Sequence, residues 1–213
     1  MSNKESFSWE LYKKAPIVGI VRGVSIDVIM DITQAYIKAG LHTIEITMNT
    51  DGATEIISKL RSEFKELNVG AGTVCNMKDY NMAVKAGAQF IVTPIIDEAV
   101  ISSAVRQELP IFPGAYSPTE IYKAWSLGAS AVKIFPATQL GVQFIKDISG
   151  PLNAIRLLPT GGVSLENIKS FFEAGVVGVG MGSSLFIKKF IEEGNFEGLA
   201  EHFIKIKTEI EDF

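Results

Sequence analysis

Two charged side chains, Lys133 and Glu45, occur inside short apolar runs of the sequence, a position that suits catalytic chemistry. Lys133 lies in Ala131-Val-Lys-Ile-Phe-Pro136, and Glu45 lies in Thr43-Ile-Glu-Ile-Thr47. Burying an amine or a carboxylate without a partner costs several kcal/mol, so both need a reason to be there. Desolvation lowers the pKa of a lysine, and a neutral amine can attack a ketone to form a Schiff base. Glu45 would then be the group that moves protons.

A structural role is the alternative for both side chains. Lys133 and Glu45 would form an internal ion pair, or one strand would be shifted so that its charged side chain faces solvent. For a single such residue, the structural interpretation would be favoured.

Eight short apolar runs are the predicted strands that would position these side chains, and longer amphipathic segments separate them. In residues 25–39, for example, apolar residues recur at helical spacing. Glycines 40, 87, 128 and 175 each stand where a helix would end, and their spacings of 47, 41 and 47 residues indicate repeated βα units. The predicted strands are residues 17–21, 43–47, 68–72, 90–94, 110–113, 131–136, 156–159 and 177–181.

Eight strands alternating with helices in 213 residues form either a (β/α)8 barrel or a doubly wound open sheet. The first strand is followed by Arg22-Gly-Val-Ser25, which is no G-x-G-x-x-G motif, and no P-loop motif occurs in the chain. Ser117-Pro-Thr-Glu120 is a capping box that predicts a helix start. No linker divides the sequence. We therefore predict an α/β fold, a (β/α)8 TIM barrel with a short N-terminal helix, as one domain over residues 1–213.

Glycine-rich segments follow the last two predicted strands, at residues 159–164 and 180–184. Barrels commonly bind phosphate at this pair of strands, through backbone N–H groups and a helix N-terminus. The alternative is that the glycines form tight turns and the serines cap helices. We favour phosphate binding because both loops fall at the expected strands. The two segments are Pro159-Thr-Gly-Gly-Val-Ser164 and Gly180-Met-Gly-Ser-Ser184.

Composition and charge exclude several other classes of function. Hydrophobic residues make up 47% and charged residues 21%, and the net charge of -4 argues against nucleic-acid binding. The longest uncharged run, Ala174 to Ile187, is shorter than the roughly 18 residues that span a bilayer, so we expect no membrane segment. The N-terminus lacks the apolar region of a secretory signal, which favours the cytoplasm. One cysteine, Cys75, and two histidines argue against redox or zinc chemistry.

Four motifs together carry a resemblance to a known family. In chain order they are Gly70-Ala-Gly-Thr-Val74, Pro113-Gly114 with Ser117-Pro-Thr-Glu120, Lys133-Ile-Phe-Pro-Ala137 and Pro159-Thr-Gly-Gly-Val163. They resemble the 2-keto-3-deoxy-6-phosphogluconate (KDPG) and 4-hydroxy-2-oxoglutarate (KHG) aldolase family over nearly the whole chain. The resemblance implies a class I aldolase on a (β/α)8 barrel, usually a homotrimer, that uses no metal and no organic cofactor.

The resemblance also implies a role for individual residues. Lys133 matches the Schiff-base lysine, and Glu45 matches the acid/base carboxylate. Thr73 matches a hydroxyl that binds the pyruvate carboxylate, while Pro94 and Phe135 match residues that shape the pocket. The alternatives are purely structural: Thr73 would be an ordinary strand residue, Pro94 would end a strand and Phe135 would belong to the hydrophobic core. The family handles the phosphorylated end of its substrate at Thr160, Gly161, Gly162, Ser183 and Ser184.

This chain departs from the family pattern at Asn49. Many members carry an arginine there that helps to hold the keto-acid carboxylate, but the sequence here is Thr47-Met-Asn-Thr50. Some members resemble this chain in placing an arginine after the first strand, so Arg22 is the candidate replacement. A guanidinium can hold a carboxylate with two hydrogen bonds. The alternative for Arg22 is a surface ion pair.

The implied reaction is cleavage of KDPG to pyruvate and glyceraldehyde 3-phosphate, with KHG cleavage to pyruvate and glyoxylate as a further activity. One alternative is another sugar-phosphate barrel enzyme, a decarboxylase or isomerase, which would form no covalent pyruvate adduct. Another is a non-catalytic keto-acid-binding protein, which would release no aldehyde. The configuration at C4 and the phosphorylation of the substrate stay open.

Overall fold

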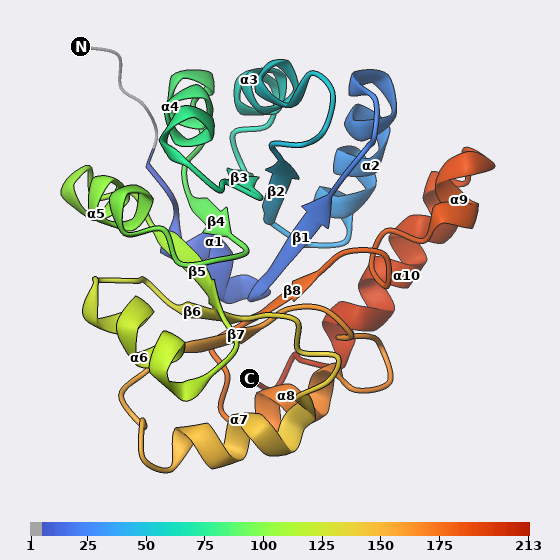
Figure 1. Ribbon diagram of the computed structural model, residues 1–213. Helices are drawn as coiled ribbons and strands as arrows, with labels where there is room; N and C mark the ends of the chain where they lie inside the picture. Colours follow the sequence, from blue (N-terminus) through green and yellow to red (C-terminus); the bar gives the residue numbers. More distant parts are fainter. Residues whose placement is uncertain (1–5) are drawn as a thin grey trace.

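Eight parallel strands form a ring enclosed by helices in the computed structural model, which describes residues 6–213 (Figure 1). The strand order is β7-β6-β5-β4-β3-β2-β1-β8, and a bridge between Thr160 and Gly180 joins the end of β7 to β8. This arrangement confirms the predicted (β/α)8 barrel. The strands are β1 (Ile17–Val21), β2 (Thr43–Thr47), β3 (Asn68–Gly72), β4 (Ile91–Thr93), β5 (Ile111–Ala115), β6 (Val132–Ile134), β7 (Leu157–Pro159) and β8 (Val179–Met181).

Helices alternate with the strands and cover the outside of the ring, with α2, α3 and α4 on the side opposite α6, α7 and α8 (Figure 1). The predicted short N-terminal helix is α1, and its serine N-cap, Ser8, accepts a hydrogen bond from Leu11 N. The helices are α1 (Trp9–Lys14), α2 (Ile26–Lys38), α3 (Ala53–Glu63), α4 (Met77–Ala86), α5 (Glu98–Arg106), α6 (Pro118–Ser126), α7 (Gly141–Ser149), α8 (Ile168–Glu173), α9 (Lys188–Glu192) and α10 (Phe196–Thr208).

Local sequence signals account for the helix ends. Gly40, Gly87, Gly128 and Gly175 all have left-handed backbone conformations, with φ between 78° and 97°, as the sequence predicts for residues that end helices. The capping box at the start of α6 is also confirmed, because the Ser117 hydroxyl accepts from the Glu120 backbone while the Glu120 carboxylate accepts from the Ser117 backbone. These signals determine where the chain leaves four of the helices and where α6 begins.

The strand bounds differ from the prediction from β4 onward. β1, β2 and β3 have the predicted bounds, whereas β4, β6, β7 and β8 are each shorter than the apolar run that contains them. β5 begins at Ile111 and continues to Ala115, beyond the predicted end at Pro113. It continues because Gly114 and Ala115 pair with Lys133 and Ile134 of β6.

Aromatic side chains close the N-terminal end of the barrel. Phe7, which precedes α1, lies against Phe90 with 5.4 Å between ring centroids, and Phe90 lies 5.8 Å from Phe112 of β5. Tyr12 of α1 belongs to the same buried cluster. Because this end is filled with apolar rings, polar chemistry is confined to the carboxyl ends of the strands.

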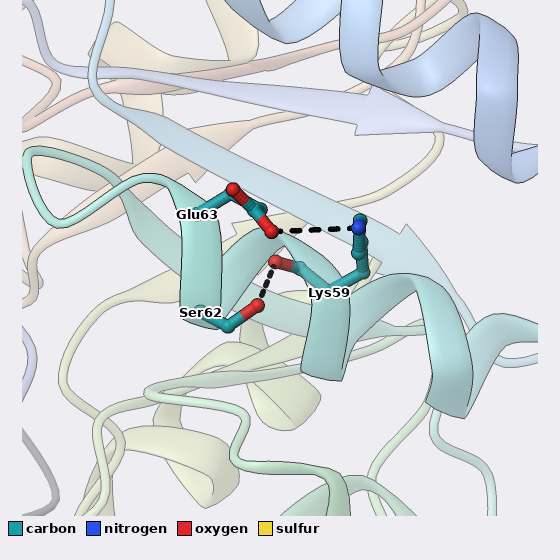
Figure 2. A network of polar contacts seen from close by, with 3 residues as sticks. All are labelled: Lys59, Ser62 and Glu63. Carbon is teal, nitrogen blue, oxygen red and sulfur yellow. Dashed lines mark hydrogen bonds and ion pairs between the residues drawn. The ribbon is translucent and has the colours of Figure 1, made fainter.

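The outward faces of the helices carry exposed polar contacts that are separate from the barrel interior. On α3, the Lys59 amine lies 3.4 Å from the Glu63 carboxylate, and the Ser62 hydroxyl donates to the Lys59 carbonyl at 2.8 Å (Figure 2). Both charged side chains are about half exposed, so the ion pair contributes only about 0.3–0.5 kcal/mol.

Over residues 6–213, every helix falls short of the length and apolar character needed to cross a bilayer. Within the same residues, no three histidine, cysteine, aspartate or glutamate side chains are grouped so that they could hold a metal ion.

Candidate active site

Lys133 lies at the middle of β6 and points into the barrel, where it is only 6% exposed. Its amine nitrogen stands 4.8 Å from the centre of the Phe135 ring, which gives the cationic form a favourable contact. Burial nevertheless lowers the pKa of the Lys133 amine; the charge of Glu45 opposes this shift, and that of Arg22 adds to it. The protein therefore favours the neutral, nucleophilic amine more than water does.

Glu45 lies at the middle of β2 and is almost completely buried, at 1% exposure. Burial raises the pKa of its carboxyl group, while the positive charges of Lys133 and Arg22 lower it. Its Oε2 atom has no hydrogen-bond partner within the described part of the chain. A buried oxygen without a partner is costly, so this carboxylate is arranged for something other than stability.

Lys133 and Glu45 are both inside the barrel, so the alternative in which one of them faces solvent is wrong. The charge of Lys133 lowers the pKa of Glu45, and the charge of Glu45 raises the pKa of Lys133, so the two groups interact electrostatically inside the barrel. A nucleophilic amine beside an acid/base carboxylate is the arrangement that Schiff-base chemistry requires.

Gly72, the last residue of β3, makes the space that Glu45 occupies. A Cβ atom at position 72 would lie 2.2 Å from Oε1 and 2.6 Å from Cδ of Glu45. No side chain fits there unless the carboxylate moves. Sequence reasoning did not assign this role to Gly72, although a glycine inside a predicted strand is a signal of close approach by another group.

Four further candidate residues follow the strands directly. Arg22 comes after β1, Thr73 after β3, Pro94 after β4 and Phe135 after β6, so all of them lie at the carboxyl end of the barrel. Thr73 has a left-handed backbone with φ of 56°, which is uncommon for a residue other than glycine. Strained backbone of this kind concentrates at functional sites.

A cavity of about 800 Å³ opens among the loops that follow β1, β7 and β8. Lys133, Glu45, Thr73 and Pro94 do not line it. It nevertheless adjoins Lys133, because Phe135, whose ring contacts the Lys133 amine, is one of the lining residues. The candidate residues that line the cavity are Arg22, Phe135, Thr160, Gly161, Gly162, Ser183 and Ser184.

The two glycine-rich loops are joined to each other beside this cavity. Gly161 and Gly162 have φ values of 89° and 76°, and a Cβ at position 162 would lie 2.9 Å from Cα of Thr138. The Ser184 hydroxyl donates to the Val163 carbonyl at 2.6 Å, so it ties the loop after β8 to the loop after β7. Ser183 is exposed beside it. These backbone conformations suit N–H groups that converge on an anion.

Lys188, the first residue of α9, also lines the cavity and was not singled out in the sequence. Its amine lies 3.2 Å from the Glu192 carboxylate in an exposed ion pair. The signal was weak, because a lysine four residues after Ser184 reads as an ordinary helix-surface residue.

The position of Arg22 bears on the departure at Asn49. Asn49 is exposed in the turn between β2 and α3, in which the Thr50 N–H donates to the Thr47 carbonyl at 2.9 Å. Arg22 lines the cavity, and its charge shifts the pKa values of both Lys133 and Glu45. Within residues 6–213 Arg22 forms no ion pair, contrary to the surface ion-pair alternative.

Comparisons with known proteins agree on one family. The chain is 33% identical over 190 residues to 2-dehydro-3-deoxy-phosphogluconate aldolase of Haemophilus influenzae, covering 88% of this chain and 89% of the relative. It is 34% identical over 175 residues to 2-dehydro-3-deoxy-6-phosphogalactonate aldolase of Escherichia coli, covering 81% and 85%.

A solved structure is similar over most of its length as well. The crystal structure of KDPG aldolase from Legionella pneumophila, with pyruvate captured as a covalent carbinolamine intermediate, superimposes with a TM-score of 0.86 at 25% identity, covering 92% of this chain and 96% of that one. The family model described as KDPG and KHG aldolase matches residues 9–201. The chain therefore belongs to the KDPG and KHG aldolase family.

Proposed function

We propose that this protein is a class I aldolase, a lyase that cleaves KDPG to pyruvate and glyceraldehyde 3-phosphate. The observation that carries the proposal is the buried Lys133 amine, whose pKa is lowered, in the same interior as the unpartnered Glu45 carboxylate. The relatives support it by their names, and the Legionella enzyme supports it by its covalent pyruvate intermediate.

The first step is formation of an imine. The neutral Lys133 amine adds to the C2 ketone of the substrate; the resulting carbinolamine hydroxyl takes up a proton and leaves as water, which gives a positively charged iminium ion. Burial supports this step because it lowers the pKa of Lys133 and so favours the unprotonated amine more than water does. The positive iminium nitrogen then serves as the acceptor of electrons.

The second step is cleavage of the C3–C4 bond. Glu45, directly or through a water molecule, removes the C4 hydroxyl proton; the C4 oxygen becomes the aldehyde carbonyl, and the bonding pair moves into an enamine. Glu45 then returns a proton to C3, and water hydrolyses the iminium to release pyruvate and the free Lys133 amine. Its burial supports this role, because a raised pKa makes the Glu45 carboxylate a stronger proton acceptor than an exposed glutamate.

Binding of the two ends of the substrate is assigned to the surrounding loops. We propose that Arg22 holds the keto-acid carboxylate in place of an arginine at position 49, with Thr73 as a second donor. The phosphate would lie among Thr160, Gly161, Gly162, Ser183 and Ser184, and Pro94 and Phe135 would shape the pocket. The support is that Arg22 and the glycine-rich loops border one cavity beside Lys133.

Four further properties complete the proposal. The chain acts as a single domain, in the cytoplasm, without a metal or an organic cofactor, and it assembles as a homotrimer. Exposed apolar side chains after two neighbouring strands support self-association: Ile95, which follows β4, and Tyr116, which follows β5, are 50% and 45% exposed.

A cleavage assay tests the function and the substrate together. Pyruvate release from KDPG, its galactonate-type C4 epimer and KHG is followed by coupling to lactate dehydrogenase, with Lys133→Ala as the inactive control. We expect pyruvate and glyceraldehyde 3-phosphate from KDPG. Carbon dioxide or a rearranged sugar phosphate without pyruvate would favour a decarboxylase or isomerase, and binding of substrate without any product would favour a keto-acid-binding protein.

A further inference from the structure

A short chain of hydrogen bonds joins the β1–α2 loop to the β2–α3 loop at the mouth of the barrel. The backbone N–H of Gly23 donates to the hydroxyl oxygen of Thr50 at 3.0 Å. The same hydroxyl lies 3.0 Å from the hydroxyl of Thr47, the last residue of β2. Thr47 is completely buried and Thr50 is 6% exposed, so the contact between the two hydroxyls is buried, whereas the hydrogen bond to Gly23 is partly buried.

Thr50 is itself held firmly by the turn in which it lies. Its backbone N–H donates to the Thr47 carbonyl at 2.9 Å, and its carbonyl accepts from the Ala53 N–H at 3.1 Å. With both backbone groups bonded, the hydroxyl has a fixed position relative to β2. It is therefore an anchor on the barrel rather than a mobile loop group.

The hydrogen bond to Gly23 acts on Arg22 through the peptide plane. The Gly23 N–H and the Arg22 carbonyl belong to one planar unit, so holding the N–H fixes the ψ angle of Arg22. Gly23 has a left-handed backbone with φ of 65°, and a Cβ there would meet nothing within 4 Å. Glycine adopts many conformations, and because position 23 carries no packed side chain, we take the hydrogen bond to Thr50 as the constraint at this point of the loop.

We propose that Thr50 is the positioning residue for Arg22, and that its hydroxyl holds the guanidinium where it binds the carboxylate of the keto acid. The turn that includes Asn49 thus contributes to carboxylate binding indirectly, through the hydrogen bond from Gly23 to Thr50 in the neighbouring loop. This inference rests on the proposed function, in particular on the assignment of Arg22. Thr50 touches no substrate and acts only through the backbone of its neighbour.

The test measures how tightly pyruvate is held in the imine. Borohydride reduces the imine to a stable adduct, so the dependence of adduct formation on pyruvate concentration gives a half-saturating concentration without any aldehyde. Thr50→Val keeps the shape of the side chain and removes the hydroxyl, while Thr50→Ser keeps the hydroxyl. Thr43→Val is the matched control, because it removes a buried hydroxyl that accepts from Asn68 at the other end of the same strand.

We expect Thr50→Val to raise the half-saturating pyruvate concentration about tenfold, the effect of one hydrogen bond, while the amount of adduct at saturation is unchanged. Thr50→Ser should resemble the wild type, and Thr43→Val should lower thermal stability without changing pyruvate affinity. In an Arg22→Gln background, Thr50→Val should have no further effect, because the group that it positions is gone.

Two results would overturn the inference. One is an unchanged half-saturating concentration in Thr50→Val, and the other is an equal fold-change with and without Arg22, which would indicate general damage. Both are distinct from failure of the proposed function itself, in which the wild-type protein would form no pyruvate adduct at any concentration.

Discussion

Substituting Gly72 by alanine tests how closely the position of the Glu45 carboxylate controls catalysis. The new Cβ would lie 2.2 Å from Oε1 of Glu45, against an ordinary contact of 3.4 Å, so the carboxylate must retreat by about 1.2 Å. A displacement of about 1 Å in a catalytic group can cost about 100-fold in rate, or about 2.7 kcal/mol of transition-state stabilisation. We therefore expect kcat for pyruvate release to fall about 100-fold in Gly72→Ala.

The same variant should keep its nucleophile, because Lys133 comes from β6 and the three atoms nearest to a Cβ at position 72 all belong to Glu45. Steady-state cleavage therefore drops while borohydride still traps pyruvate on Lys133. Gly150→Ala is the matched control: its Cβ would lie 3.6 Å from the nearest atom, the Asp147 carbonyl oxygen, so activity should stay at the wild-type level. A folded Gly72→Ala protein with wild-type kcat would refute the assignment of Glu45 as the proton-transfer group.

Further predictions concern Arg22 and the buried pair. Arg22→Lys keeps the charge but loses the two-pronged donor, so the half-saturating pyruvate concentration should rise at least tenfold while the pH dependence of trapping stays unchanged. Arg22→Gln also removes a cation that lowers the pKa of Lys133, so the fall of the trapping rate at acidic pH should begin at a higher pH. Glu45→Gln removes a carboxylate that raises the pKa of Lys133, so the same fall should begin at a lower pH. Shifts of the reverse sign would contradict this electrostatic account. The double variant Lys133→Met/Glu45→Met should unfold at a higher temperature, with a gain of about 1–4 kcal/mol, because it removes two desolvated charges. A loss of stability would show instead that the pair is retained for structural reasons.

The bounds of the first three strands follow directly from the sequence, whereas the bounds of the later strands do not. The predicted bounds of β1, β2 and β3 agree with the structure; β1 is a continuous run of apolar residues and glycine, whereas β2 and β3 also contain polar residues. The apolar run that predicts β5 ends at Pro113, yet Gly114 and Ala115 continue the pairing with β6. That continuation depends on a close approach: a Cβ on Gly114 would lie 2.5 Å from the Pro94 backbone. Contacts of this kind between distant segments cannot be recognised from the local sequence pattern.

The candidate site was accessible from sequence to different degrees. Lys133 and Glu45 stood out because a charge within a short apolar strand has few explanations, and both proved to be buried inside the barrel. Gly72 and Thr50 were missed for a different reason. Their roles depend on which side chain or amide lies opposite them on a neighbouring strand or loop, and a single sequence does not contain that pairing.

The most direct test of the account is identification of the residue that pyruvate modifies. The protein is incubated with pyruvate and borohydride, its intact mass is measured, and the modified peptide is mapped, with Lys133→Ala in parallel. The account predicts one pyruvate-derived adduct per chain, on the peptide that contains Lys133, and no adduct in the variant. An unmodified wild-type protein, or an adduct on another lysine, would contradict the Schiff-base role of Lys133.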